Sequence, residues 1–150
     1  MKTHAYEIHS EWAGSTGAGY RNYDRGHHVS IASNSLHVSA DPAFLGDAQL
    51  PNPEQLLLAA ASSCQLLSFL AVAALAAVDV IAYEDDAHAV MPEAGTATQI
   101  TEIDLHVRVT VRGADETHVL LLLEKAHAEC YISNTLKAKV TVHPTVTVIA

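Results

Sequence analysis

The C-terminal third of the chain contains two segments in which apolar and polar residues alternate. Within residues 98–112, the apolar face consists of Ile103, Leu105, Val107, Val109 and Val111. Within residues 139–149, it consists of Val140, Val142, Val146 and Val148. A period of two is typical of a strand with one buried and one solvent-facing side, so both segments are predicted strands. Pro144 places the second one at a sheet edge or a bulge, because proline cannot donate a ladder hydrogen bond.

The N-terminal third shows shorter alternating segments. Residues 6–9 alternate and predict an opening strand before the glycine-containing turn AGSTGAGY. A second strand is predicted over residues 20–33, with a turn at Asn34 and a continuation through LHVSA as a hairpin or meander. Residues 41–52 have the Pro, Gly and Asp content of a loop.

The longest apolar run carries no charge from Gln55 to Val78 and includes Cys64. Pro53 fits the first turn of a helix, where its missing N–H has no effect. As a helix, this run would be about 36 Å long, enough to cross a hydrocarbon core of about 30 Å. However, it is rich in alanine, contains Ser and Gln, and is flanked by acidic residues rather than Lys or Arg anchors. We therefore predict a core helix, and because a 150-residue monomer cannot surround it, a homodimer.

A second helix is predicted after Gly113, with Asp115 as its N-cap. Its sequence ETHVLLLLEKAHAEC has an apolar side that includes Val119, Leu120, Leu122 and Leu123. The order of elements is strands, apolar helix, strands, helix and strand, which is typical of an α+β fold. The length predicts a single domain over residues 1–150.

Composition excludes several classes of function. The net charge is −9 and no run of basic residues occurs, so we expect neither a nucleic-acid partner nor binding to an anionic membrane. The opening MKTHAYEIHSEW lacks the pattern of a secretory signal, which favours a cytoplasmic location with the two cysteines as thiols. The ten histidines lack the spacing of a metal site, and no Gly-rich phosphate loop precedes a helix, so we expect no metal or nucleotide cofactor.

The two cysteines differ in their helical context. Cys64 lies about eleven residues into its helix, too far from the N-terminus for the helix dipole to lower its pKa, so an activating cation must come from another element. Cys130 follows a helix C-terminus unless CYISNTL begins a new turn. These positions favour Cys64 as nucleophile and Cys130 as resolving thiol, although each could be a buried, unreactive cysteine. Arg21 and Arg25, which would share a face of an extended strand, are candidate cations or an ordinary exposed pair.

Two motifs carry a resemblance to a known family. NPEQLLLAAASSCQLLSFLAVAA (residues 52–74) combines an Asn-Pro-Glu-Gln helix start with a cysteine ten residues after the Glu. AHAECYISNTL (residues 126–136) places a cysteine before a Ser-Asn pair and a closing strand. In this order and spacing, the motifs resemble the OsmC/Ohr family of osmotically inducible protein C and organic hydroperoxide resistance proteins. The resemblance covers essentially the whole chain, and WAGSTGAGYRNYDRGHHVSI looks like the opening of a less-studied branch.

The resemblance implies an intertwined α+β homodimer whose cysteine-bearing helices pack centrally against antiparallel sheets. It also implies thiol-dependent reduction of organic hydroperoxides in oxidative or osmotic stress defence, with an external dithiol as reductant. Cys64 matches the peroxidatic cysteine, Cys130 the resolving cysteine, and Glu54 the carboxylate that orients an arginine. The Gly-Gly-Arg turn of the better-known branch is missing, so the arginine is Arg21 or Arg25, and Arg21 is favoured because it is closest to the turn.

Spacing adds a constraint to this implied site. On a straight helix, Glu54 and Cys64 are about 15 Å apart along the axis, too far for one arginine to bridge within a chain. Either the helix bends early or Glu54 and its arginine serve the Cys64 of the partner subunit, and we predict the second. The alternative function is a non-enzymatic dimer that binds an apolar small molecule and whose cysteines never cycle.

Overall fold

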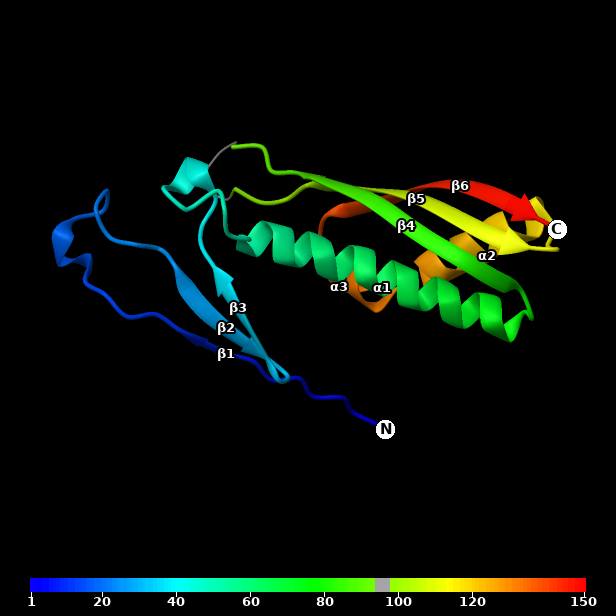
Figure 1. The fold of residues 1–150 in the computed structure, drawn as a ribbon, viewed down its shortest axis with the longest axis horizontal. Helices are drawn as coiled ribbons and strands as arrows, with labels where there is room; N and C mark the ends of the chain where they lie inside the picture. The colour runs from blue at the N-terminus through cyan, green and yellow to red at the C-terminus, as the bar shows by residue number, and fades with distance from the viewer. Residues whose placement is uncertain (94–97) are drawn as a thin grey trace. The chain divides into compact units, whose positions relative to one another are not determined.

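The structure is a computed structural model, and it describes residues 1–93 and 98–150. The chain divides into two compact units, Met1–Leu56 and Leu57–Ala150, and each has its own three-stranded sheet (Figure 1). The combination of these sheets with long helices confirms the predicted α+β class. The prediction of a single domain over the whole chain stays a prediction.

The first unit contains an antiparallel sheet in the order β1 (His9–Glu11), β2 (His27–Ile31) and β3 (Asn34–Val38). The predicted hairpin is confirmed, and its turn at Ala32 and Ser33 has Ala32 in the left-handed region at φ 53°. Two short 3₁₀ helices, η1 (Thr16–Ala18) and η2 (Pro42–Phe44), interrupt the connections.

Two predicted strand boundaries in this unit are wrong. The first strand begins at His9, and residues 6–8 are not part of it. Residues 20–26 form turns and irregular chain before β2, where Asp24 accepts hydrogen bonds from Trp12 through its carbonyl and from Gly26 through its carboxylate. These local hydrogen bonds satisfy the backbone without a sheet partner, which is why the alternation there does not produce a strand.

A capping box begins the long helix α1 (Pro53–Leu75) in the last residues of the first unit. The Asn52 side chain accepts from the Gln55 backbone N–H at 2.9 Å, and the Gln55 side chain accepts from the Asn52 N–H at 3.0 Å. Pro53 occupies the first helical position, as predicted. This reciprocal pair explains the Asn-Pro-Glu-Gln start in physical terms, because it satisfies two backbone donors that the helix itself leaves free.

The second unit contains a mixed sheet in the order β4 (Asp79–Val90), β5 (Glu102–Arg112) and β6 (Lys139–Ile149). β4 and β5 pair antiparallel, whereas β5 and β6 pair parallel, unlike the antiparallel sheets expected. The parallel pairing follows from the crossover through α2 (Glu116–Ala128) and α3 (Tyr131–Thr135), which returns the chain to the starting end of β5.

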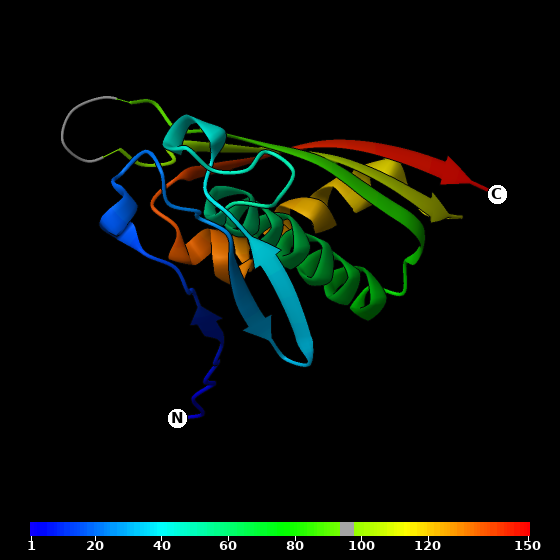
Figure 2. The same ribbon diagram turned by 60° about the vertical axis from the view of Figure 1, so that its left-hand side comes forward.

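One face of this sheet forms the core. The predicted inward residues of β5 are all at most 1% exposed. They pack with residues of α1 and α2, which lie along the same face of the sheet (Figure 2). Asp115 caps α2 by accepting from the His118 N–H, as predicted. β6 lies at a sheet edge, which confirms the expectation from Pro144.

The helix α1 is only partly covered by its own chain. It is long and apolar enough to cross a membrane by length and composition, a test that core helices of soluble proteins also pass. Only 28% of its most apolar 18-residue window is buried. Leu67, Leu70 and Leu75 are 63%, 38% and 90% exposed, so a large apolar surface remains on this helix.

The fully buried Leu105 provides a test of this core. We expect Leu105→Ala to lower the free energy of unfolding by about 2–5 kcal/mol, because it leaves a cavity among close-packed side chains. The adjacent but exposed His106→Ala should change it by less than about 0.5 kcal/mol. Urea denaturation of both variants measures the difference, and equal losses would contradict the assigned strand faces.

Candidate active site

The two cysteines lie together in the second unit. Cys64 is half-buried on α1, and Cys130 is fully buried and immediately precedes α3 as its N-cap residue. Both are free thiols, and a hydrogen bond with the Cys130 side chain contributes to the raised pKa of Cys64. The fold therefore brings together two thiols that are distant in the sequence.

The start of α3 also contacts Cys64. The alternative that CYISNTL begins a new helical turn is the one observed, since α3 starts at Tyr131. The backbone N–H groups of Ile132 and Tyr131 hydrogen bond to Cys64 and lower its pKa. The Cys64 side chain, which comes from α1, therefore serves as the acceptor for two amides at the start of α3.

The balance of these effects keeps the Cys64 thiol protonated. Burial is the largest cause and raises the pKa, and the hydrogen bond and charge of Cys130 raise it further, against the opposing Ile132 and Tyr131 amides. No cationic side chain of the described residues is among these causes. The expectation that an activating cation comes from another element stays a prediction.

An apolar cavity of about 300 Å³ opens beside Cys64. It is lined by Leu67, Ser68, Ala71, Leu75, Glu129 and Tyr131 among others. The Ser68 hydroxyl donates to the Ala126 carbonyl at 2.8 Å, which satisfies that polar group within the protein. The cavity can therefore hold an apolar molecule whose reactive end meets the thiol.

Glu54 lies in the first turn of α1, directly inside the capping box. It is half-buried, and the helix dipole favours its negative charge at this end of the helix. The predicted role of Glu54 in orienting an arginine toward Cys64 stays a prediction.

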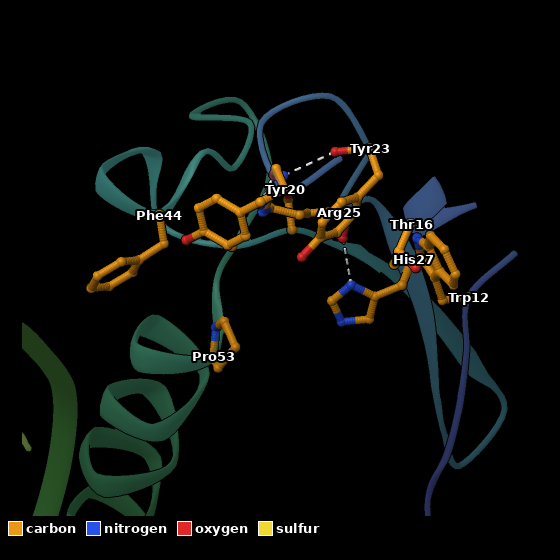
Figure 3. Close-up of a pocket in the computed structure, with 10 residues that line it drawn as sticks. Trp12, Thr16, Tyr20, Tyr23, Arg25, His27, Phe44 and Pro53 are labelled. Atoms are coloured by element: carbon orange, nitrogen blue, oxygen red, sulfur yellow. Dashed lines mark hydrogen bonds between the residues drawn. The ribbon is translucent and has the colours of Figure 1, made fainter. Parts of the chain in front are cut away.

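Arg25 is held in the first unit by backbone carbonyls and aromatic rings (Figure 3). Its Nη1 donates to the Tyr23 carbonyl at 2.9 Å, and its Nη2 donates to the Tyr20 carbonyl at 2.7 Å. Its guanidinium carbon lies 5.0 Å and 4.0 Å from the ring centroids of Tyr20 and Tyr23. These contacts use two of five guanidinium N–H groups, so three remain available to other acceptors.

Arg25 also borders a second cavity, of about 440 Å³, within the first unit. Its lining includes the aromatic side chains of Trp12, Tyr20, Tyr23 and Phe44, all drawn in Figure 3, where Tyr20 and Tyr23 lie beside the arginine. Arg21 is exposed in the same turn region. The expectation that Arg21 and Arg25 share a strand face is wrong, because this segment is not a strand.

The histidines do not assemble into a metal centre in the described ranges. Over residues 1–93 and 98–150, no group of three or more His, Cys, Asp or Glu side chains could hold a metal ion. His106 and His143 stack at 4.7 Å on the exposed face of the sheet, and His143 hydrogen bonds to Asp104 at 2.7 Å. Both histidines are exposed, on the side of the sheet opposite the apolar residues predicted for these two strands.

The match to a known protein family covers most of the chain. A sequence model of the OsmC-like protein family matches residues 46–145, which is 100 of the 150 residues. The chain belongs to the OsmC-like protein family. The match includes both cysteine motifs and confirms the resemblance that they carry. Curated proteins provide no sequence match.

Solved structures of OsmC-like proteins share the fold. An OsmC-like protein of unknown function from Vibrio cholerae is 23% identical, with a TM-score of 0.86, covering 95% of this chain and 100% of that chain. An organic hydroperoxide resistance protein from Elizabethkingia anophelis is 24% identical, with a TM-score of 0.70, covering 99% and 100%. A second such protein, from Bacillus subtilis, is 17% identical, with a TM-score of 0.62, covering 96% and 98%. At these identities the likeness establishes the OsmC-like fold.

Sequence reasoning missed two residues of the second unit that carry buried polar atoms. Gln65 follows Cys64 and is fully buried, and neither of its amide atoms has a hydrogen-bond partner among the described residues. The Tyr83 hydroxyl on β4 is likewise buried and unpartnered. A polar residue beside a cysteine in an otherwise apolar helix was the available signal for Gln65. No comparable signal existed for Tyr83, because the sequence analysis gives no range for a strand over residues 79–90.

The contact between the thiols predicts their response to a disulfide-forming oxidant. We expect diamide to convert the reduced protein to a form lacking two thiols and two hydrogens, because Cys64 and Cys130 can join without a large rearrangement. Thiol titration and intact mass measure the change. A non-reducing gel dominated by covalently linked dimers would contradict the intrachain pairing.

Proposed function

We propose that this protein is a thiol-dependent peroxidase that reduces organic hydroperoxides to alcohols. The observation that carries the proposal is the dithiol pair, with half-buried Cys64 opening on an apolar cavity and Cys130 fully buried behind it. The organic hydroperoxide resistance proteins that share the fold support this reaction class.

The proposed reaction uses the two thiols in sequence. The Cys64 thiolate attacks the terminal peroxide oxygen, the O–O bond breaks, and the alkoxide leaves and takes up a proton as the alcohol. Cys64 becomes a sulfenic acid, which condenses with the Cys130 thiol to a disulfide and water. An external dithiol then reduces the disulfide and returns both thiols.

The cation that this reaction needs is proposed to be Arg25. The position nearest the turn favours Arg21, but Arg25 is half-buried and already oriented by two carbonyls and two rings. An arginine fixed in this way loses little further conformational freedom when it binds a thiolate and a carboxylate. Glu54 is the proposed carboxylate partner of this arginine.

The proposed active site forms in a homodimer in the cytoplasm. The exposed leucines of α1 support dimerisation, because a second copy would remove this apolar surface from water. With about 15 Å of helix between Glu54 and Cys64, the carboxylate and arginine of one subunit are proposed to serve the cysteine of the other.

Thiol counting tests the peroxidase. One equivalent of cumene hydroperoxide should remove two thiols per chain, because sulfenic acid formation is followed by disulfide formation. Cys64→Ser should abolish the loss, whereas Cys130→Ser should stop at a sulfenic acid that a dimedone probe traps. An unchanged thiol titre in the wild-type protein would favour the alternative function, a non-enzymatic dimer that binds an apolar molecule, for which the aromatic cavity in the first unit is a candidate site.

The pH dependence of alkylation tests the cation. In a Cys130→Ser background, the pH midpoint of Cys64 alkylation should lie higher in Arg25→Ala than with Arg25 present, because a nearby cation favours the thiolate and its removal raises the pKa. Arg21→Ala is the matched control and should leave the midpoint unchanged. A shift in Arg21→Ala alone would return the role to Arg21.

A further inference from the structure

The cavity of about 440 Å³ that Arg25 borders lies within the first unit and is called the aromatic cavity here. The ten described residues that line it all belong to Met1–Leu56, and nine of them precede residue 46, where the match to the OsmC-like family model begins. Its volume falls in the range of about 300–1,000 Å³ that is typical of small-molecule sites. The aromatic cavity is therefore formed almost entirely by a segment that the family model does not match.

Four aromatic side chains form walls of the aromatic cavity. The indole N–H of Trp12 donates to the Asp24 carbonyl at 2.8 Å, and its ring meets that of Tyr23 edge to face at 6.2 Å between centroids. Tyr20 and Phe44 lie on the other side of the view from Trp12 in Figure 3. Such rings favour a flat, aromatic ligand. Because Trp12 is already held by its own contacts, it loses little further freedom when a ligand binds.

Arg25 carries the only permanent charge among the described lining residues. Its guanidinium is fixed by the carbonyls and rings of Tyr20 and Tyr23, and three of its N–H groups remain for other acceptors. No aspartate or glutamate is among the described lining residues to balance this charge. A cation in an apolar cavity of this kind attracts an anion.

A single guanidinium favours a carboxylate over a phosphate. The two oxygens of a carboxylate match the guanidinium fork, and its one negative charge balances that of Arg25. A phosphate monoester carries about two negative charges at neutral pH. The other basic side chain of the described lining is His27, whose Nδ1 is already used in a hydrogen bond to the Arg25 carbonyl at 2.8 Å.

We propose that the aromatic cavity binds an aromatic carboxylate. The ring of this ligand lies among the aromatic side chains of the walls, and its carboxylate pairs with Arg25. The inference goes beyond the proposed peroxidase, because the ligand is not a hydroperoxide and the lining includes neither cysteine.

Titration with two matched ligands tests the role of the charge. Trp12 is the only tryptophan in the chain, so its indole N–H gives a single, unambiguous signal in a proton–nitrogen NMR spectrum. Naphthoate should move this signal with a Kd at least about tenfold lower than that of naphthamide, its neutral counterpart, as for one hydrogen bond to a charged group. The full-length Cys64→Ser protein is used, because it cannot form a disulfide between its two cysteine positions.

Three substitutions assign the two parts of the ligand to their walls. Arg25→Gln should abolish the preference for naphthoate over naphthamide, whereas Arg21→Gln, in the same turn region, should retain it. Phe44→Ala should weaken the binding of both ligands by a similar factor and keep their ratio, because it removes a wall and no charge. Since Arg25 also orders its own turn, the comparison of the two ligands with Arg25 in place decides the result where Arg25→Gln loses structure.

Several outcomes would overturn the proposal. Equal affinities for naphthoate and naphthamide would refute the role of the charge, and tighter binding of naphthyl phosphate would refute the choice of a carboxylate. A Trp12 signal that neither ligand moves would refute the site, and if that signal changes with protein concentration instead, the occupant is a second copy of this chain. Thiol counting with cumene hydroperoxide is independent of all these results, so a failure here and a failure of the proposed peroxidase are distinguishable.

Discussion

The structure depends on the burial of one uncharged helix. α1 has no charged side chain after Glu54, and its residues Ala61, Phe69, Val72 and Ala73 are at most 6% exposed against the sheet and α2. The inner face of β5 is apolar at every inward position because it forms one wall of this core. The same helix leaves large leucines on its other sides, and the second copy proposed here covers that surface. Fold and proposed assembly therefore follow from the same requirement.

This requirement also determines the electrostatics around the cysteine on the helix. An apolar layer that covers Cys64 raises its pKa, and the two amides at the start of α3 only partly oppose the effect. A reactive thiol cannot obtain a compensating charge from a helix that must remain uncharged to stay buried. The cation proposed for Cys64 therefore belongs to a segment outside this core, and the turn that carries Arg25 is ordered by its own carbonyl and aromatic contacts.

Much of this architecture could be predicted from the sequence, and the failures have local causes. Where one face is fully buried, as in β5, alternation predicts the strand faces correctly. The predicted bounds of the final strand match β6 at both ends, but its apolar face is only partly buried and Val148 is 42% exposed. β4 was missed because Glu84, Asp85 and Asp86 interrupt its pattern, although Asp85 faces inward and finds a partner in Ser62. The segment around Arg25 was predicted as a strand. Hydrogen bonds between its side chains and the backbone hold it in a turn, and such bonds leave no periodic pattern in the sequence.

The candidate site could likewise be predicted from the sequence only in part. The pairing of Cys64 with Cys130 follows from motifs that the sequence displays, whereas the surroundings of the pair depend on a strand, β4, that it obscures. Tyr83 is placed by that strand and packed by Phe69 from the helix, so its buried position depends on tertiary structure.

The two cysteines consequently differ in which groups can stabilise a negative charge on their sulfur atoms. Cys64 is half-buried beside an open cavity, and it is the thiol for which a cation from another segment is proposed. Cys130 is fully enclosed, and a guanidinium brought next to it would itself have to be desolvated at large cost. The proposed arginine therefore suits the exposed side of the pair, at Cys64, rather than the enclosed Cys130.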